Sequence, residues 1–388
     1  MRLGRRIDLA AWDTPHMHRT AVDALLAGIV AAVVTGLLTP VTARVAERFG
    51  AVDQPRDRGL SDRPTPLLGG IAIFFGVAVS MAIWLLGGSH QWTAILWGAL
   101  IITVVGAIDD LVDLNPFVKL AGQVCAVLPP VLSGVDVDNF TLPFVHRVDL
   151  GGSGGVLTVI GLVAIINVVN LSDGIDGLAA GVCAISGGTF CVIALSLGRP
   201  DTAILAAIVL GACLGFLRHN FYPARIFMGD SGALLLGFTL GALAIQGLLK
   251  TAAVATLLFP LLVLAVPIID TSFVVAKRIK YGQPVYTADQ THLHHRFLNI
   301  GFSQRRAALT MWGWCAILAG AALATRFIHP HAHGNWHTGP TVAVALIGAL
   351  ALGASIYMVY LLEIVKLANP RIRRREAEAR AAAERRTA

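Results

Sequence analysis

The sequence is poor in charged residues. Asp, Glu, Lys and Arg make up only 14% of its 388 residues, whereas hydrophobic residues make up 56%. Soluble globular proteins carry about 25% charged residues, and the mean hydropathy of +0.72 points away from them as well. The composition excludes a soluble globule and predicts an all-α, polytopic integral membrane protein.

Cysteine is also scarce, and its positions exclude two kinds of site. All five cysteines lie in apolar runs, and none forms a CxxC pair. This spacing supplies neither a disulfide framework nor a thiolate metal site, so we interpret the cysteines as small buried hydrophobic residues. They are Cys125, Cys183, Cys191, Cys213 and Cys315.

The first 20 residues lack the apolar stretch of a cleavable signal peptide and carry four arginines instead. We expect residues 1–20 to form a polar N-terminal segment, 21–363 a multi-span domain and 364–388 a basic tail. Within the domain, residues 135–152 alternate in hydropathy, which favours a short hairpin.

The apolar runs predict about 10–11 membrane-spanning helices, each long enough for a hydrocarbon core of about 30 Å. They are residues 21–40, 68–86, 92–108, 117–134, 154–169, 177–197, 202–218, 232–249, 252–276, 307–326 and 341–363.

The basic residues predict how these spans are oriented. One set of loops, together with the tail, holds 22 of the 30 Lys and Arg residues, which predicts that this set faces the cytoplasm of a plasma (inner) membrane. Eleven spans then leave the arginine-bearing N-terminal segment outside, against the same rule, so either the span count or the rule fails there. The excess of basic residues in the cytoplasmic loops accounts for the net charge of +7. We therefore expect no nucleic-acid partner.

The segment NVVNLSDGIDGLAAG, residues 167–181, follows an apolar run and places short polar side chains at a spacing of three. This spacing predicts that they line one side of a helix end, while the neighbouring glycines allow a sharp turn or close ligand approach. The side chains are Asn167, Asn170, Asp173 and Asp176.

Two further acidic motifs lie on the same predicted side of the membrane. In AIDDLVDLNP, Asp109 and Asp113 share a face if the helix continues through both, and Asn115-Pro116 is typical of a helix start. In NFYPARIFMGDSG, Asp230 opens an apolar helix, whose free N–H groups could hold a phosphate beside a carboxylate-bound Mg²⁺.

A histidine motif, DQTHLHHRF, lies in the most basic internal loop. A zinc site is one interpretation, but no cysteine or HExxH pattern supports it. Hydrogen bonding to phosphate or sugar oxygens suits imidazole and guanidinium groups better. The residues concerned are His292, His294, His295 and Arg296.

Together, the motifs place acids, amides and cationic groups on one membrane face. This combination is typical of metal-assisted phosphoryl transfer, and a lipid phosphate is the acceptor that such a location favours. An ion transporter is the non-enzymatic alternative, but the acids gather at one face and form no relay across the bilayer.

These motifs give the chain a resemblance to the polyprenyl-phosphate N-acetylhexosamine-1-phosphate transferases. The match runs from about residue 40 to 306 and includes RPTPLLGG, DDLVD, NVVNLSDGIDGLAAG, NFYPARIFMGDSG and HLHHR in the family's order. The resemblance implies transfer of a sugar 1-phosphate from a UDP-sugar to undecaprenyl or a related polyprenyl phosphate, with release of UMP and with Mg²⁺ or Mn²⁺ as cofactor.

The resemblance also implies roles for individual residues. Asp230 and Asn170 match metal ligands, Asp109 and Asp110 match acids that deprotonate the lipid phosphate or position the metal, and Asp173 and Asp176 match acids on the nucleotide side. The residues expected to contact the substrates are Lys119, Asn167, Asn220, Phe227, His292, His294, His295 and Arg296.

Within this family, an HxHHR motif is typical of the branch that uses UDP-GlcNAc, whereas an HHH motif is typical of the branch that uses UDP-MurNAc-pentapeptide. The sequence reads HLHHR, which favours GlcNAc 1-phosphate transfer as the first membrane step of a cell-wall or surface glycan. Another UDP-N-acetylhexosamine and UDP-MurNAc-pentapeptide remain alternative donors, and a homodimer is one assembly open to such a chain.

Overall fold

The structure is a computed structural model, and it describes most of the chain. The described residues are 15–54, 64–137, 139–142, 146–249, 265–280, 297–298, 301–328, 331–332, 335–336 and 338–361. Nearly all of them are helical, which confirms the predicted all-α class. The predicted tail, and the motif residues 292–296, lie outside the described residues.

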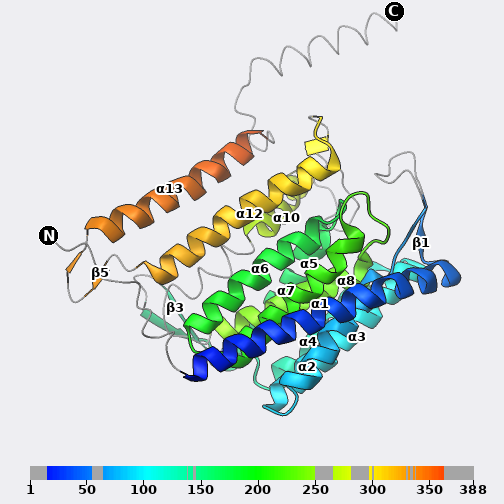
Figure 1. The fold of residues 1–388 in the computed structure, drawn as a ribbon, viewed down its shortest axis with the longest axis horizontal. Helices are drawn as coiled ribbons and strands as arrows, with labels where there is room; N and C mark the ends of the chain where they lie inside the picture. The colour runs from blue at the N-terminus through cyan, green and yellow to red at the C-terminus, as the bar shows by residue number, and fades with distance from the viewer. Residues whose placement is uncertain are drawn as a thin grey trace, which may run out of the picture.

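Helices make up the bundle in Figure 1. They are α1 (Pro15–Phe49), α2 (Gly69–Trp84), α3 (His90–Val112), α4 (Pro116–Leu132), α5 (Gly154–Ser172), α6 (Leu178–Ser196), α7 (Pro200–Asn220), α8 (Gly229–Leu243), a π-helical turn (Ala244–Leu249), α10 (Ala265–Lys280), α12 (Gln304–Phe327) and α13 (Thr338–Leu361).

Within the described ranges, three two-stranded sheets join helix ends. They pair β1 (Val52–Asp53) with β2 (Thr65–Pro66), β3 (Asn139–Leu142) with β4 (His146–Asp149), and β5 (His331–Ala332) with β6 (Asn335–Trp336), all antiparallel. The β3–β4 pair, with Asn139 opposite Asp149, confirms the hairpin predicted in 135–152. Figure 1 shows β1 and β3 at opposite ends of the bundle.

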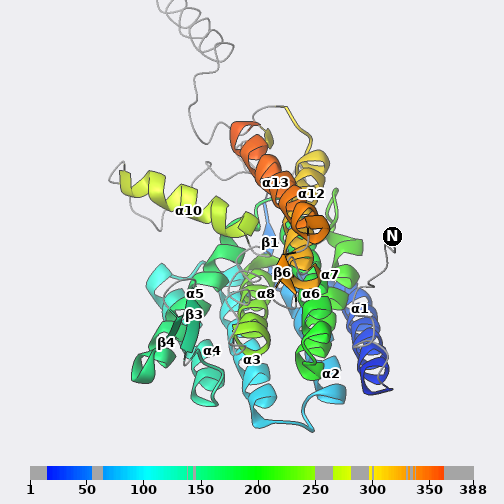
Figure 2. The ribbon, with the colours of Figure 1, turned by 90° about the vertical axis from the view of Figure 1, so that its left-hand side faces the viewer.

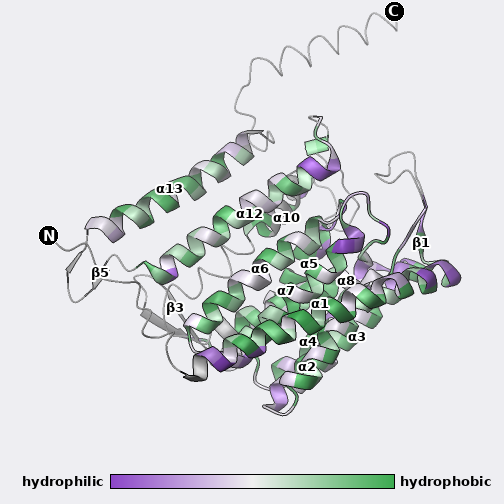
Figure 3. Ribbon diagram, viewed as in Figure 1, coloured by the Kyte–Doolittle hydropathy of each residue, from purple (hydrophilic) through white to green (hydrophobic). Residues whose placement is uncertain are grey.

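Among the described residues, eight helices are long and apolar enough to cross a membrane, and α2 and α4 are shorter apolar helices. These ten helices correspond to ten of the predicted spans and confirm a polytopic membrane protein. Hydrophobic residues cover the middle of the bundle, with hydrophilic ones towards its ends (Figure 3). The hydrophobic stretches therefore match the surroundings that a bilayer offers.

The predicted span at 252–276 lies only partly within the described residues. Residues 250–264 lie outside the described part, and α10 covers 265–280. Figure 2 shows α10 lying across the direction of α6 and α8. Its second half, VVAKRIK, mixes apolar and basic residues, a pattern that suits an interfacial position better than the hydrocarbon core.

Helices α6, α7 and α8 have the most buried apolar stretches of the candidate spans. Helix α1 packs closely along α7. The two backbones are so near that a Cβ on Gly211 would lie 1.9 Å from the carbonyl oxygen of Gly28. Small residues allow such close backbone approach, which drives helix association in lipid. The tight core fixes the helix ends where the polar motifs lie.

The N-terminus of α8 fits against two glycines from other helices. A Cβ on Gly70 of α2 would lie 2.0 Å from the backbone nitrogen of Gly232, and one on Gly106 of α3 would lie 2.5 Å from Cα of Ser231. No side chain fits these contacts unless the backbone shifts. The two glycines therefore define where Asp230 is held.

We expect Gly70→Ala to destabilise the protein, although alanine favours a helix over glycine by about 1 kcal/mol. Overpacking against backbone costs about 1 to 3 kcal/mol, so the thermal unfolding midpoint of the purified protein should fall. Gly161→Ala in α5 is the control, since no neighbouring atom of the described residues lies within 4 Å of that Cβ. Equal midpoints in the two variants would contradict the packing argument.

Candidate active site

Four helix ends bring the acidic motifs together. The last turn of α3, the first turn of α4, the C-terminal end of α5 and the first turn of α8 meet at one end of the bundle, because successive helices alternate in direction. The same end carries β2, whose Pro66 carbonyl oxygen accepts a hydrogen bond from the Phe227 amide at 2.8 Å.

Lys119 lies at the centre of this cluster. Its Nζ is 2.9 Å from Oδ2 of Asp109 and 3.4 Å from Oδ1 of Asn170, and it contacts Oδ2 of Asp230. The cap of α4 positions it: Asn115 Oδ1 accepts a hydrogen bond from the Phe117 amide at 2.9 Å, and Pro116 is the first helical residue. This cap confirms the predicted helix start.

Asn170 completes the contact with Asp230. Its Nδ2 donates a hydrogen bond of 2.6 Å to Oδ1 of that aspartate. Asn170 and Asp230 are 60 residues apart in sequence, so this contact brings the two predicted motifs together in space. Amide, ammonium and two carboxylates thus form a single polar group at the helix ends.

Asp110 is occupied by backbone donors. Its Oδ1 accepts from the Asp230 amide at 2.7 Å, and its Oδ2 accepts from the Ser231 amide at 3.1 Å. The first N–H groups of α8, which we expected to be free for a phosphate, are therefore capped by a side chain from α3. Gly229 allows this approach, because its φ is +67° and a Cβ there would lie 2.4 Å from Asp110.

Asp113 does not share a face with Asp109. Helix α3 ends at Val112, and Asp113 adopts a left-handed backbone with φ of 53°. Its side chain is exposed, whereas Oδ1 of Asp109 turns back to accept a hydrogen bond of 2.7 Å from the Leu114 amide. The condition for Asp109 and Asp113 to share a face, a helix that continues through both, is therefore not met.

The motif 167–181 divides into two parts. Helix α5 ends at Ser172, so Asn167 and Asn170 are helical, while Asp173 and Asp176 lie in the loop before α6. Asn167 pairs with Gln123 of α4, donating a hydrogen bond of 2.6 Å and accepting one of 3.2 Å. Asn167 thus joins two helices behind the acids and does not line the cluster.

Asp173, in the loop before α6, has a pKa near neutrality. The residue keeps some exposure, but protein atoms surround its carboxyl group. This burial raises its pKa to about 7, with further contributions from the negative charges of Asp230, Asp110 and Asp176. Burial also raises the pKa of Asp176, whose Oδ2 accepts a hydrogen bond of 2.9 Å from the Ala224 amide.

Asn220 connects the loops on the other side of the site. Its buried side chain accepts from the Gly177 amide at 3.0 Å and donates to the Ile226 carbonyl at 3.0 Å. Asn220 therefore fixes the Asp173–Gly177 loop to the segment that contains Phe227. Phe227 is partly exposed beside Gly69, which donates a backbone hydrogen bond of 3.1 Å to its carbonyl oxygen.

Aromatic side chains that no sequence motif predicted pack next to this loop. Trp312 of α12 donates from Nε1 to the Leu178 carbonyl at 3.3 Å, and its ring lies 5.4 Å from that of Phe221. Arg305 lies over Phe221, 5.6 Å from the ring centroid. A tryptophan near the polar end of a span was the one available signal. Gln123 was also missed, because a lone glutamine in an apolar run has no distinctive pattern.

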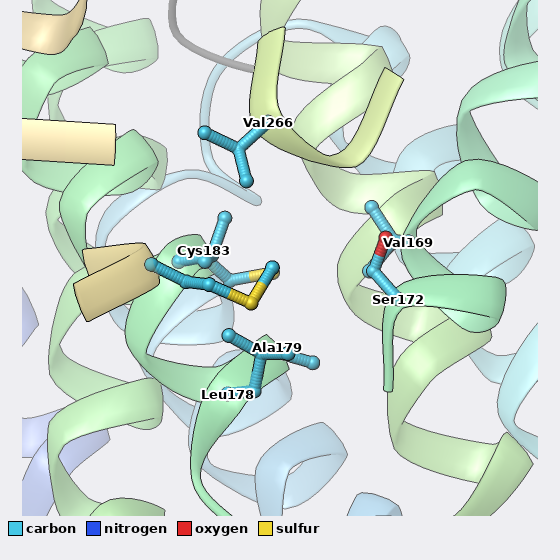
Figure 4. Close-up of a pocket in the computed structure, with 8 residues that line it drawn as sticks. Val169, Ser172, Leu178, Ala179, Cys183 and Val266 are labelled. Carbon is cyan, nitrogen blue, oxygen red and sulfur yellow. The ribbon is translucent and has the colours of Figure 1, made fainter. Parts of the chain in front are cut away.

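An apolar pocket lies behind the loop, between α5, α6, α10 and α12 (Figure 4). Ser172 is its one polar side chain, and its hydroxyl donates to the Val168 carbonyl at 2.8 Å. The remaining lining is apolar: Val169, Leu178, Ala179, Val182, Cys183, Val266 and Met311.

We next ask whether the side chains around Asp230 could bind a divalent cation. Among the described residues, no group of three or more His, Cys, Asp or Glu side chains is placed to hold a metal. A mixed set is present instead, because oxygens of Asp109, Asn170 and Asp230 already surround a cationic group, the Lys119 ammonium. Carboxylate and amide oxygens are the hard ligands that Mg²⁺ and Mn²⁺ prefer, so these residues fit such an ion.

Comparison with known proteins agrees with these motifs. Residues 92–248 match the family model described as glycosyl transferase family 4. This range contains most of the cluster described above, from the end of α3 to α8.

Individual relatives match over most of the chain. A protein of Bacillus subtilis (strain 168) named "Probable undecaprenyl-phosphate N-acetylglucosaminyl 1-phosphate transferase" is 39% identical over 289 residues, covering 74% of this chain and 81% of the relative. The "Decaprenyl-phosphate N-acetylglucosaminephosphotransferase" of Mycolicibacterium smegmatis is 36% identical over 357 residues, covering 84% and 87%.

A third relative carries a different name. The "Phospho-N-acetylmuramoyl-pentapeptide-transferase" of Desulforudis audaxviator is 34% identical over 339 residues, covering 78% of this chain and 98% of the relative. With such identity to all three relatives along most of its length, this chain belongs to the polyprenyl-phosphate N-acetylhexosamine-1-phosphate transferases of glycosyl transferase family 4.

Proposed function

We propose that the protein transfers GlcNAc 1-phosphate from UDP-GlcNAc to undecaprenyl or a related polyprenyl phosphate and releases UMP. One observation carries the proposal: acids from α3 and α8 and an amide from α5 meet around Lys119 at the end of a membrane bundle. Asp173 of the α5–α6 loop lies close enough for the charges of Asp230 and Asp110 to act on it. Phosphoryl transfer needs such positioned charges more than it needs covalent chemistry.

The choice of donor and acceptor is supported by the names of the relatives. Those from Bacillus subtilis and Mycolicibacterium smegmatis are named for N-acetylglucosamine and for a polyprenyl phosphate, and the HLHHR motif of this chain favours the same sugar. The Desulforudis audaxviator relative is named for a muramoyl-pentapeptide, so UDP-MurNAc-pentapeptide is the competing donor to test.

A divalent cation, Mg²⁺ or Mn²⁺, would be held by Asp230 with Asn170 and Asp109. When bound, it would supply positive charge to the pyrophosphate oxygens of the donor. The chain's own residues provide the rest. Asp110 holds the start of α8, and with it Asp230, through two backbone hydrogen bonds.

Asp173 is the group that we propose accepts the proton of the lipid phosphate, which then attacks the β-phosphate of the donor. A pKa of about 7 suits a general base at physiological pH. Asp109 and Asp110 fit this role less well, since each already accepts two contacts from Lys119 or backbone N–H groups. Attack by an aspartate, giving a two-step route, is the alternative chemistry.

The donor would lie along the loops that Asn220 joins. Asp176 and Phe227 are proposed to surround the uridine, with Asn220 holding their loops together and Lys119 directed to a phosphate. The histidine motif at 292–296, outside the described residues, is proposed to bind the pyrophosphate and sugar. We further propose that this site and the C-terminal tail face the cytoplasm of the plasma membrane, as the distribution of basic residues favours.

A competition assay tests the function. Purified protein with Mg²⁺, undecaprenyl phosphate and equal amounts of UDP-GlcNAc and UDP-MurNAc-pentapeptide should release UMP and yield a lipid with the mass of the GlcNAc product. The muramoyl product would replace the proposed sugar with the alternative one. Ion flux through proteoliposomes without either product would support a transporter instead.

A further inference from the structure

Lys119 contacts the same oxygen atoms that a divalent cation would use. Its Nζ approaches Asp109 Oδ2, Asp230 Oδ2 and Asn170 Oδ1, which come from α3, α8 and α5. An ammonium group and a divalent cation repel each other strongly at such distances. They cannot both occupy the point where these three oxygens converge.

The position of Lys119 on its helix lets its side chain leave without moving the backbone. It lies in the first turn of α4, and 18% of its side chain is exposed. Four methylene groups carry the ammonium, so rotation about its side-chain bonds can move the charge by several ångströms towards solvent. The exit lies at the helix end, where a phosphate group can arrive.

The charge of the cluster also requires one cation or another. Four carboxylates lie close enough together for contacts or charge interactions to link them. They are those of Asp109, Asp110, Asp173 and Asp230. Lys119 is the one cationic side chain, among those the structure describes, with an ion pair to this group. Buried like charges without a counterion are costly, so removing Lys119 should strengthen the demand for a metal.

We propose that Lys119 and the divalent cation compete for the oxygens of Asp109, Asn170 and Asp230, so that cation binding releases the ammonium to a substrate phosphate. Lys119 is then a positioning residue that keeps the acids assembled before the cation binds. The competition stands on the contacts alone. Only the destination of the released ammonium rests on the proposed function.

The test measures Mn²⁺ binding to the purified full-length protein, by electron paramagnetic resonance of the free ion, without any substrate. Lys119→Met should lower the dissociation constant for Mn²⁺ at least about tenfold, because it removes the competing charge. Lys119→Arg keeps that charge and should bind Mn²⁺ like the wild type. Arg218→Met removes one exposed charge from the same end of the bundle and should change the constant less than about twofold.

A second measurement keeps the proposal testable if Lys119→Met folds poorly. Without Mn²⁺ its thermal midpoint should lie below that of the wild type, and saturating Mn²⁺ should raise it by more than it raises the wild type. Unchanged or weaker Mn²⁺ binding by Lys119→Met, or equally tightened binding by Lys119→Arg, would overturn the competition.

The inference and the proposed function can fail separately. Tighter Mn²⁺ binding by Lys119→Met, together with a wild type that releases no UMP from UDP-GlcNAc, would keep the competition and remove the proposed function. UMP release by the wild type, together with unaltered Mn²⁺ binding by Lys119→Met, would do the reverse.

Discussion

Asp230→Asn should reduce UMP release about a thousandfold, because a metal-held charge contributes several kcal/mol to a phosphoryl-transfer transition state. The substitution removes the negative charge that contacts Lys119 and accepts from Asn170. It keeps the size of the side chain and the start of α8, since Asp110 bonds to the backbone at 230 and 231.

The effect is measured as kcat for UMP release with saturating Mg²⁺, together with the thermal midpoint of the variant. Asp201→Asn is the matched control: Asp201 lies at the other end of α7 and accepts a hydrogen bond of 3.0 Å from Trp92 Nε1. It should retain normal turnover. An Asp230→Asn protein with turnover near that of the wild type would remove the metal-ligand assignment.

Asp173→Asn has the second largest expected effect, a loss of about a hundredfold, the lower end of the range that general bases contribute. The amide cannot accept the proton of the lipid phosphate. Its effect should fall on kcat rather than on the KM for the donor, because the proposed role is at the reacting phosphate. A loss confined to the donor KM would assign Asp173 to nucleotide binding instead.

The pH profile separates these roles further. The pKa of Asp173 is raised to about 7, so its carboxyl group is neutral at pH 6 and charged at pH 8. Wild-type kcat/KM should therefore rise with pH and level off. A bound divalent cation favours the charged form, which places the midpoint at or below 7. The rise should be absent in Asp173→Asn, and an unchanged rise would contradict the assignment.

Much of the fold follows from local sequence patterns. Apolar runs predict ten of the described helices, because a chain in lipid satisfies its backbone hydrogen bonds within each helix. The cap at Asn115-Pro116 and the hairpin within 135–152 were likewise predictable, since turn and cap chemistry is local. The family resemblance predicted that Asp109, Asn170 and Asp230 belong together.

The remaining features depend on contacts between distant segments. A spacing of three predicted Asn167 and Asp173 on one side, but helical residues three apart diverge by about 60°, and α5 ends before Asp173. Which group caps α8 depends on the reach of Asp110 across Gly229. Neither the capped N–H groups nor the central place of Lys119 is encoded in any single motif.

The central claim is that these four helix ends form one cation-dependent site for transferring a sugar phosphate. Following a label on the β-phosphate of UDP-GlcNAc tests it most directly, with purified protein and polyprenyl phosphate. The account predicts that the label moves to the lipid in the presence of Mg²⁺ and stays in the donor when the cation is chelated. Label that remains in the nucleotide with Mg²⁺ present, or that reaches the lipid equally well without it, would contradict the account.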